Sequence, residues 1–158
     1  MTIRSVTHAS FTLERRYKAT PARVFRALSD EATKQKWFTP PETWRKDEQH
    51  MDFRVGGIET SVGGPVGGPV HAFRAIYQDI VPNERIVYSY DMMLDDVRIS
   101  VSLSSFELTQ DGDHTVLKLT EMGAYLDGFG DDGNDIRKQG TAVLLDQLGA
   151  HLVREGAN

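Results

Sequence analysis

The stretch DIRKQGTAVLLDQLGAHLV, residues 135–153, decides the fold of this 158-residue chain. Its apolar residues recur at the three- and four-residue spacing of a helix that buries a single stripe, namely Ile136, Gly140, Leu144 or Leu145, Leu148 and Leu152. A helix with one apolar stripe must cover another element to be stable. The sequence therefore predicts a long C-terminal helix that packs on a sheet.

The segments before this helix have the two-residue period of strands. From Trp44 to Thr120, apolar and polar residues alternate in successive runs that are separated by turns. No helix long enough for a parallel crossover lies between these runs, so the sheet should be antiparallel, with one dry face and one wet face. In the run 97–104 we assign Val97, Ile99, Val101 and Leu103 to the dry face. Ser100, Ser102 and Ser104 then fall on the wet face.

The N-terminal part predicts one further strand and two short helices. Phe11, Leu13, Arg15 and Tyr17 alternate with polar residues, and Thr20-Pro21 is typical of a helix N-cap followed by its first residue. Asp30 can cap a second helix that ends near Trp37. The predicted fold is α+β: a curved antiparallel sheet of six or seven strands wraps a long C-terminal helix in a single domain, residues 1–158.

The composition narrows the functional classes. The net charge of -5 argues against a nucleic-acid binder and against binding to anionic membranes. The chain has no cysteine, which excludes thiolate catalysis and disulfides. It also shows no secretory signal and no apolar run long enough for a membrane span, so we expect a cytoplasmic protein.

Sequence motifs for cofactors and metals are missing. Residues 55–70, VGGIETSVGGPVGGPV, hold three Gly-Gly pairs, but neither the Lys-Ser/Thr of a phosphate loop nor a following helix. We interpret Gly56-Gly57 as a bulge or a positive-φ site, and residues 63–69 as an extended hairpin connection. The five histidines share no ligand spacing, and the acidic loop 126–135 lacks the calcium-loop pattern. We therefore expect no metal and no cofactor.

Several motifs together resemble one known family. Residues 11–30, FTLERRYKATPARVFRALSD, followed by Trp37, resemble the opening of the family of homologues of the heat-shock-protein-90 ATPase activator, within the SRPBCC or START-like group of helix-grip folds. Further matches are DFRVGG at 52–57, IVPNERIV at 80–87 and EMGAYLDG at 121–128. Thr141 stands where the family often has Trp, which should either enlarge a cavity or let Tyr125 or Phe129 fill it. The resemblance implies the helix-grip fold and leaves the function open.

A curved sheet that grips a helix tends to leave a hollow between them, and aromatic residues are abundant where the hollow should lie. Ligand pockets are mostly apolar with a few polar groups. Buried Tyr hydroxyls need partners, and Glu121 keeps the phase of the dry face, where it can act as an acid or base, anchor a ligand or pair with Arg15. His71 can reach the mouth of the pocket. The predicted ligand-binding residues are Trp37, Phe38, Trp44, Phe73, Tyr77, Tyr88, Tyr90, Val101, Glu121, Tyr125, Phe129, Leu145 and Leu148.

Three functions fit these features. The first is a non-enzymatic protein that holds a small hydrophobic or amphipathic molecule in the cavity. The second is a co-chaperone-like module in the stress response, with a chaperone or other protein as its partner. The third is a START-like cyclase or hydrolase that uses Glu121 with a Tyr as its acid–base pair. The first is favoured, and the chain is expected to be a monomer or a homodimer.

Overall fold

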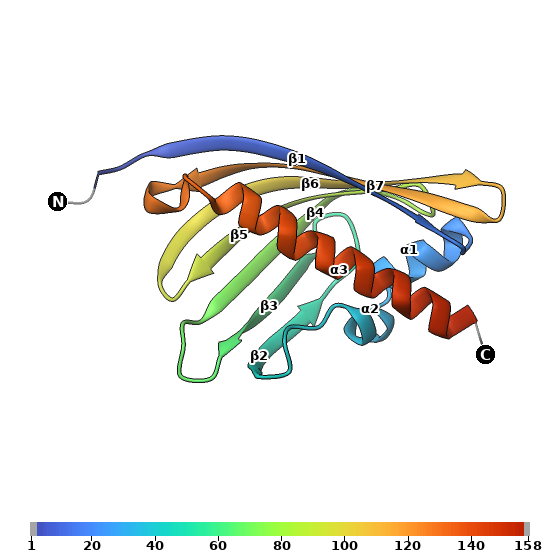
Figure 1. The fold of residues 1–158 in the computed structure, drawn as a ribbon, viewed down its shortest axis with the longest axis horizontal. Coiled ribbons are helices and arrows are strands. Elements are labelled where there is room, and N and C mark those ends of the chain that lie inside the picture. Colours follow the sequence, from blue (N-terminus) through green and yellow to red (C-terminus); the bar gives the residue numbers. More distant parts are fainter. Residues whose placement is uncertain (1–2, 157–158) are drawn as a thin grey trace.

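A curved antiparallel sheet wraps one long helix in the computed structural model, which describes residues 3–156 (Figure 1). This confirms the predicted fold class. The elements are β1 (Val6–Tyr17), α1 (Pro21–Ser29), α2 (Glu31–Trp37), β2 (Trp44–Met51), β3 (Ile58–Pro65), β4 (His71–Val81), β5 (Arg85–Leu94), β6 (Val97–Asp111), β7 (His114–Leu126), the 3₁₀ turn η1 (Asp127–Phe129) and α3 (Gly133–Gly156).

The seven strands form one sheet in the order β1-β7-β6-β5-β4-β3-β2. Strands β2 to β7 pair with their neighbours in the chain, whereas β1 pairs with β7, from Val6 opposite Leu126 to Tyr17 opposite Thr115. The helix α3 crosses the concave side of this sheet, and α1 and α2 lie near the C-terminal half of α3 (Figure 1). The sheet and the three helices therefore surround a common interior.

The helix signals in the sequence act as predicted. The side chain of Thr20 accepts a hydrogen bond from the backbone N–H of Arg23, and that of Asp30 accepts one from Thr33, so each short helix has a capped N-terminus. Leu148, a residue of α3, is fully buried. The Tyr17 hydroxyl donates to the carbonyl oxygen of Leu145 at 2.7 Å, which ties α3 to the first strand.

The faces of β6 are the reverse of those predicted. Ser100, Ser102 and Ser104 are buried, whereas Val101 is 47% exposed and Leu103 is 44% exposed. The predicted alternation of β6 is confirmed, but the set of residues predicted to face the interior is wrong. The structural reason is that the serines face a buried side chain of α3, and Leu103 pairs with Met122 across the outer face.

The glycine-rich segment is also more regular than predicted. Gly63 and Gly64 belong to β3 and are not part of a loop, because β3 runs to Pro65. A Cβ on Gly63 would collide with the carbonyl oxygen of Arg45, so glycine lets β2 approach β3 closely. Gly56, at φ +83°, has a positive φ, which is one of the two alternatives predicted for Gly56-Gly57.

Within residues 3–156, no helix combines the length and the apolar composition that a bilayer span requires.

Candidate functional site

A cavity of about 640 Å³ lies between the concave face of the sheet and the helices. Of the predicted residues, those that line it are Trp37, Phe38, Trp44, Phe73, Tyr77, Tyr88, Tyr90, Glu121 and Leu145. The other four do not. Tyr125 and Leu148 are buried in the packed interior, Phe129 lies in η1, and Val101 faces outward on β6.

Sheet register brings the polar lining residues together. Glu121 on β7 pairs with Ser104 on β6, Ser104 with Tyr88 on β5, and Tyr88 with Tyr77 on β4. Residues that pair across strands point to the same face. One row of the sheet therefore carries a carboxylate and two phenols along the wall of the cavity.

Glu121 is held by hydroxyl donors and one cation. Its Oε1 accepts hydrogen bonds from the Tyr90 hydroxyl at 2.8 Å and from the Ser104 hydroxyl at 2.7 Å. Its Oε2 lies 3.6 Å from Nη1 of Arg137 on α3 and has no hydrogen-bond partner among residues 3–156. We call Glu121, Arg137, Tyr90 and the serines of β6 the Arg137 cluster.

Arg137 explains the buried serines. Its guanidinium donates from Nη2 to Ser100 at 2.8 Å, and from Nη1 to the Tyr90 hydroxyl at 2.8 Å and to Ser102 at 3.4 Å. The guanidinium carbon also lies 5.4 Å from the ring centres of Tyr90 and Tyr125. Small hydroxyl side chains leave room for the guanidinium and accept hydrogen bonds from its N–H groups. A Val or Leu in their place would leave those donors unpaired.

A second buried ion pair, the Lys34 cluster, lies across the sheet. The ammonium of Lys34 on α2 donates to both oxygens of Glu59 on β3, at 2.9 and 2.8 Å. The Tyr77 hydroxyl donates to Glu59 Oε1, and Lys34 Nζ lies 5.0 Å from the centre of the Phe38 ring. The side chains of Glu59 and Lys34 are only 8% and 17% exposed.

The three tyrosines of the cavity wall stay neutral. Burial raises the pKa of Tyr77, Tyr88 and Tyr90 far above its usual value, and the nearby carboxylates raise it further. Tyr88 interacts with the charges of both Glu121 and Glu59, so it lies between the clusters. A neutral phenol is both a donor and an acceptor, which suits these rings to hold a polar group of a ligand.

Trp44 and His71 contribute an aromatic pair to the lining. Their ring centres are 4.8 Å apart, with planes inclined by 33°. His71 lines the cavity, where the sequence placed it. Burial lowers the pKa of His71, and the charge of Asp95 opposes this shift in part. The imidazole is therefore neutral near pH 7.

This shift predicts a pH dependence of stability. The unfolded chain takes up a proton on His71 more readily than the folded protein does. The stability that His71 contributes is therefore fully present above its unfolded pKa of about 6.5 and is lost as the pH falls from there through the lower pKa of the folded protein. We expect the free energy of unfolding to fall more between pH 7.5 and 5 in the wild type than in His71→Gln. Urea denaturation at several pH values measures this. Equal slopes would contradict it.

The charged partners were not found from the sequence, although one signal was present. Arg137 lies at helical spacing from Thr141, Leu144 and Leu148, so a basic residue heads the buried stripe. Arg15, considered as a partner of Glu121, instead pairs with Asp146 at 2.9 Å. No local pattern in the sequence marks the pairing of Lys34 with Glu59.

The position where the resembled family often has Trp is open to the cavity. Thr141 lines the cavity, and neither Tyr125 nor Phe129 does. No ring of these two residues therefore takes the place of the indole. Among residues 3–156, no three His, Asp or Glu side chains gather into a group that could hold a metal ion.

Comparisons with known proteins agree with this architecture. The family described as "Activator of Hsp90 ATPase homolog 1-like protein" matches residues 18–153. A putative uncharacterized protein from Rhizobium leguminosarum is 42% identical, with a TM-score of 0.90 over 97% of this chain and 99% of that one. Mll3558 from Rhizobium loti is 44% identical, with a TM-score of 0.86 over 93% and 99%.

A more distant structure shares the fold alone. SA2116 from Staphylococcus aureus, a protein of unknown function, is 16% identical, with a TM-score of 0.77 over 97% of this chain and 98% of that one. No curated protein matches this chain.

Proposed function

Because the chain belongs to the Activator of Hsp90 ATPase homolog 1-like family and has a large lined cavity, we propose that it binds a hydrophobic or amphipathic small molecule between the sheet and α3. The observation that supports this most is the cavity itself. Its volume of about 640 Å³ falls within the range typical of ligand sites. A protein that needed only a packed core would gain stability by filling this space.

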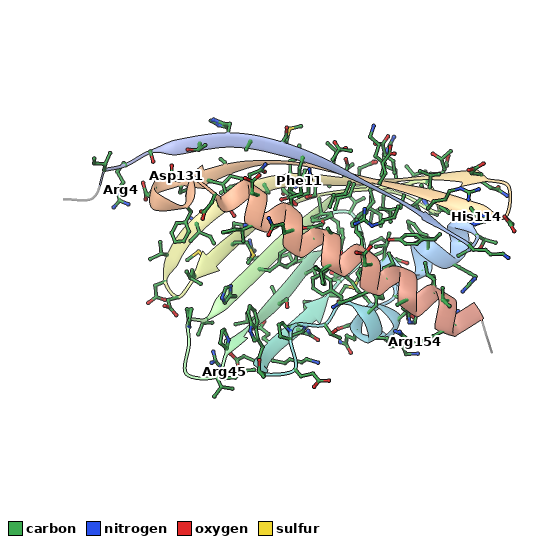
Figure 2. The ribbon with its side chains drawn as sticks, in the orientation of Figure 1. Arg4, Phe11, Arg45, His114, Asp131 and Arg154 are labelled. Carbon is green, nitrogen blue, oxygen red and sulfur yellow. The ribbon has the colours of Figure 1, made fainter. Side chains whose placement is uncertain are left out.

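The composition of the wall supports the same function. The Arg137 cluster and the Lys34 cluster contribute polar groups to the wall. The rest of the lining includes the rings of Trp44, Phe73, Tyr88 and Phe106. Apolar walls with a few placed polar groups fix both the affinity and the orientation of a small ligand. Arg45, a lining residue on β2, is labelled in Figure 2.

Tryptophan fluorescence can test the proposal. Both tryptophans of the chain, Trp37 and Trp44, line the cavity. The uncharged dye N-phenyl-1-naphthylamine should bind with one-to-one stoichiometry, quench the tryptophan emission by energy transfer and itself become brighter. The control is Trp44→Phe, which removes one indole from the lining. This variant should bind the dye with the same stoichiometry as the wild type. No saturable binding of the dye would overturn the proposal.

Filling the cavity should weaken this binding. Thr141→Trp places an indole in the open space, and we expect the affinity for the dye to fall by at least about tenfold, since loss of roughly 1.4 kcal/mol of contact is already tenfold. Direct excitation of the dye avoids a signal from the added tryptophan. Thr141→Ser keeps the hydroxyl that donates to the Arg137 carbonyl oxygen at 2.8 Å and should bind as the wild type does.

The family name favours a second candidate, a co-chaperone-like module in the stress response. That function predicts that the purified protein raises the ATPase rate of an Hsp90-type chaperone. Thr141→Trp should leave such stimulation unchanged if an outer surface is responsible. No stimulation at saturating concentration would exclude this candidate and would leave small-molecule binding unaffected.

A further inference from the structure

The buried charges of the cavity cancel in pairs. Glu121 and Arg137 are 4% and 16% exposed, and Glu59 and Lys34 are similarly enclosed. Each carboxylate faces one cation, within 3.6 Å in the first pair and 2.8 Å in the second. The deep lining therefore has two ion pairs and no uncompensated charge.

The two pairs lie on opposite sides of the cavity. Glu121 is on β7 and Glu59 is on β3, four strands apart in the sheet, which separates their backbones by roughly 19 Å before curvature. The rings of Tyr77, Tyr88 and Tyr90 bridge this distance, with centres 6.3 and 5.9 Å apart. A molecule that fills the cavity meets a polar cluster at each end and aromatic faces between them.

Both ends keep unused hydrogen-bond donors, and the Arg137 end also keeps one acceptor, Oε2 of Glu121, which a hydroxyl of the ligand can reach as a donor. A guanidinium has five N–H groups, and those on Nε and the second on Nη2 of Arg137 have no acceptor among residues 3–156. Lys34 uses two of its three N–H groups on Glu59. Each cluster can therefore donate to an oxygen of the ligand.

From these observations we propose that the ligand is an uncharged molecule with an oxygen acceptor, hydroxyl or carbonyl, at each end of an apolar body. The inference rests on the proposed function and specifies its ligand class. An acid or an amine would add a charge beside two buried ion pairs that already compensate their own charges. Its desolvation would then lack a compensating partner. A neutral diol or hydroxyketone satisfies both sets of donors without this cost.

Four ten-carbon probes test the class by displacing N-phenyl-1-naphthylamine at pH 8, below micelle-forming concentrations. We expect 1,10-decanediol to bind most tightly and 1-decanol to bind about threefold to tenfold more weakly, the value of one hydrogen bond. Decanoate and decylammonium should bind at least about tenfold more weakly than 1-decanol. If either ion displaces the dye as well as the alcohol does, the inference is wrong while the proposed function stands. If the dye itself does not bind, both are wrong.

Breaking one ion pair should change which charged probe binds more tightly. Partial unfolding of the variant would instead weaken the binding of all probes. Glu59→Gln leaves Lys34 unpaired and should raise the affinity for decanoate at least about tenfold, with no gain for decylammonium. Lys34→Gln leaves Glu59 unpaired and should favour decylammonium instead. Lys36→Gln, an exposed change on the same helix, is the matched control and should keep the wild-type order. The same order in all four proteins would overturn the inference.

Discussion

Replacing Arg137 with Met should lower the free energy of unfolding by about 3–5 kcal/mol, the usual cost of removing one partner from a buried ion pair. Methionine keeps much of the volume but leaves the Glu121 carboxylate, 4% exposed, without its cation. The hydroxyls of Ser100 and Ser102 also lose their donor. Urea denaturation near pH 7.5 measures the change.

Two further variants isolate the buried charge as the cause. Arg98→Met breaks a surface pair with Asp91, in which Arg98 is 55% exposed, and should cost at most about 1 kcal/mol. Adding Glu121→Gln to Arg137→Met removes the unpaired charge and should restore much of the lost stability. If Arg137→Met and Arg98→Met cost the same, the cluster does not act as a buried ion pair.

Leu148→Ala should lower the free energy of unfolding by about 2–5 kcal/mol, because it removes a large apolar group from a packed interior. Leu148, a residue of α3, is fully buried. Val143, on the same helix, is 56% exposed, so Val143→Ala should change stability by no more than about 0.5 kcal/mol. Thermal and urea unfolding of the two variants measure this difference. Equal losses would contradict the packing of α3 on the sheet.

The fold could be predicted because its signals are local. The N-caps at Thr20 and Asp30, the stripe that includes Leu148 and the alternation of the strands each depend on residues a few positions apart. Local patterns of this kind fix the type and order of the elements. The starting residue of α3, Gly133, differs from the predicted Asp135 by two positions, within the usual fraying of helix ends.

The set of β6 residues that faces the interior could not be predicted in the same way. Alternation gives the period of a strand but does not say which set of residues faces inward. Apolar residues usually face the core, and here that expectation fails because a buried guanidinium takes the inner face. The residues Ser100 and Ser102 satisfy Arg137, and Leu103 gains a partner on the outer face in Met122.

The polar clusters were missed because their members come from distant parts of the chain. Lys34 and Glu59 are 25 positions apart and lie on a helix and a strand, so their approach depends on how α2 sits against the sheet. Glu121 was singled out because its strand phase is local information. The pairing of Glu121 with Arg137 depends on how α3 lies across β6 and β7, which no local pattern determines.

The placement of β1 beside β7 has a consequence for how the chain folds. Every other strand pairing joins neighbours along the chain and can form as a hairpin within microseconds. The partners of β1, such as Leu126 opposite Val6, are separated by most of the chain. Closing so long a loop lowers the entropy of the chain before these contacts can contribute any stabilisation. During synthesis β1 leaves the ribosome before β7 and therefore cannot complete its pairing until β7 has been made.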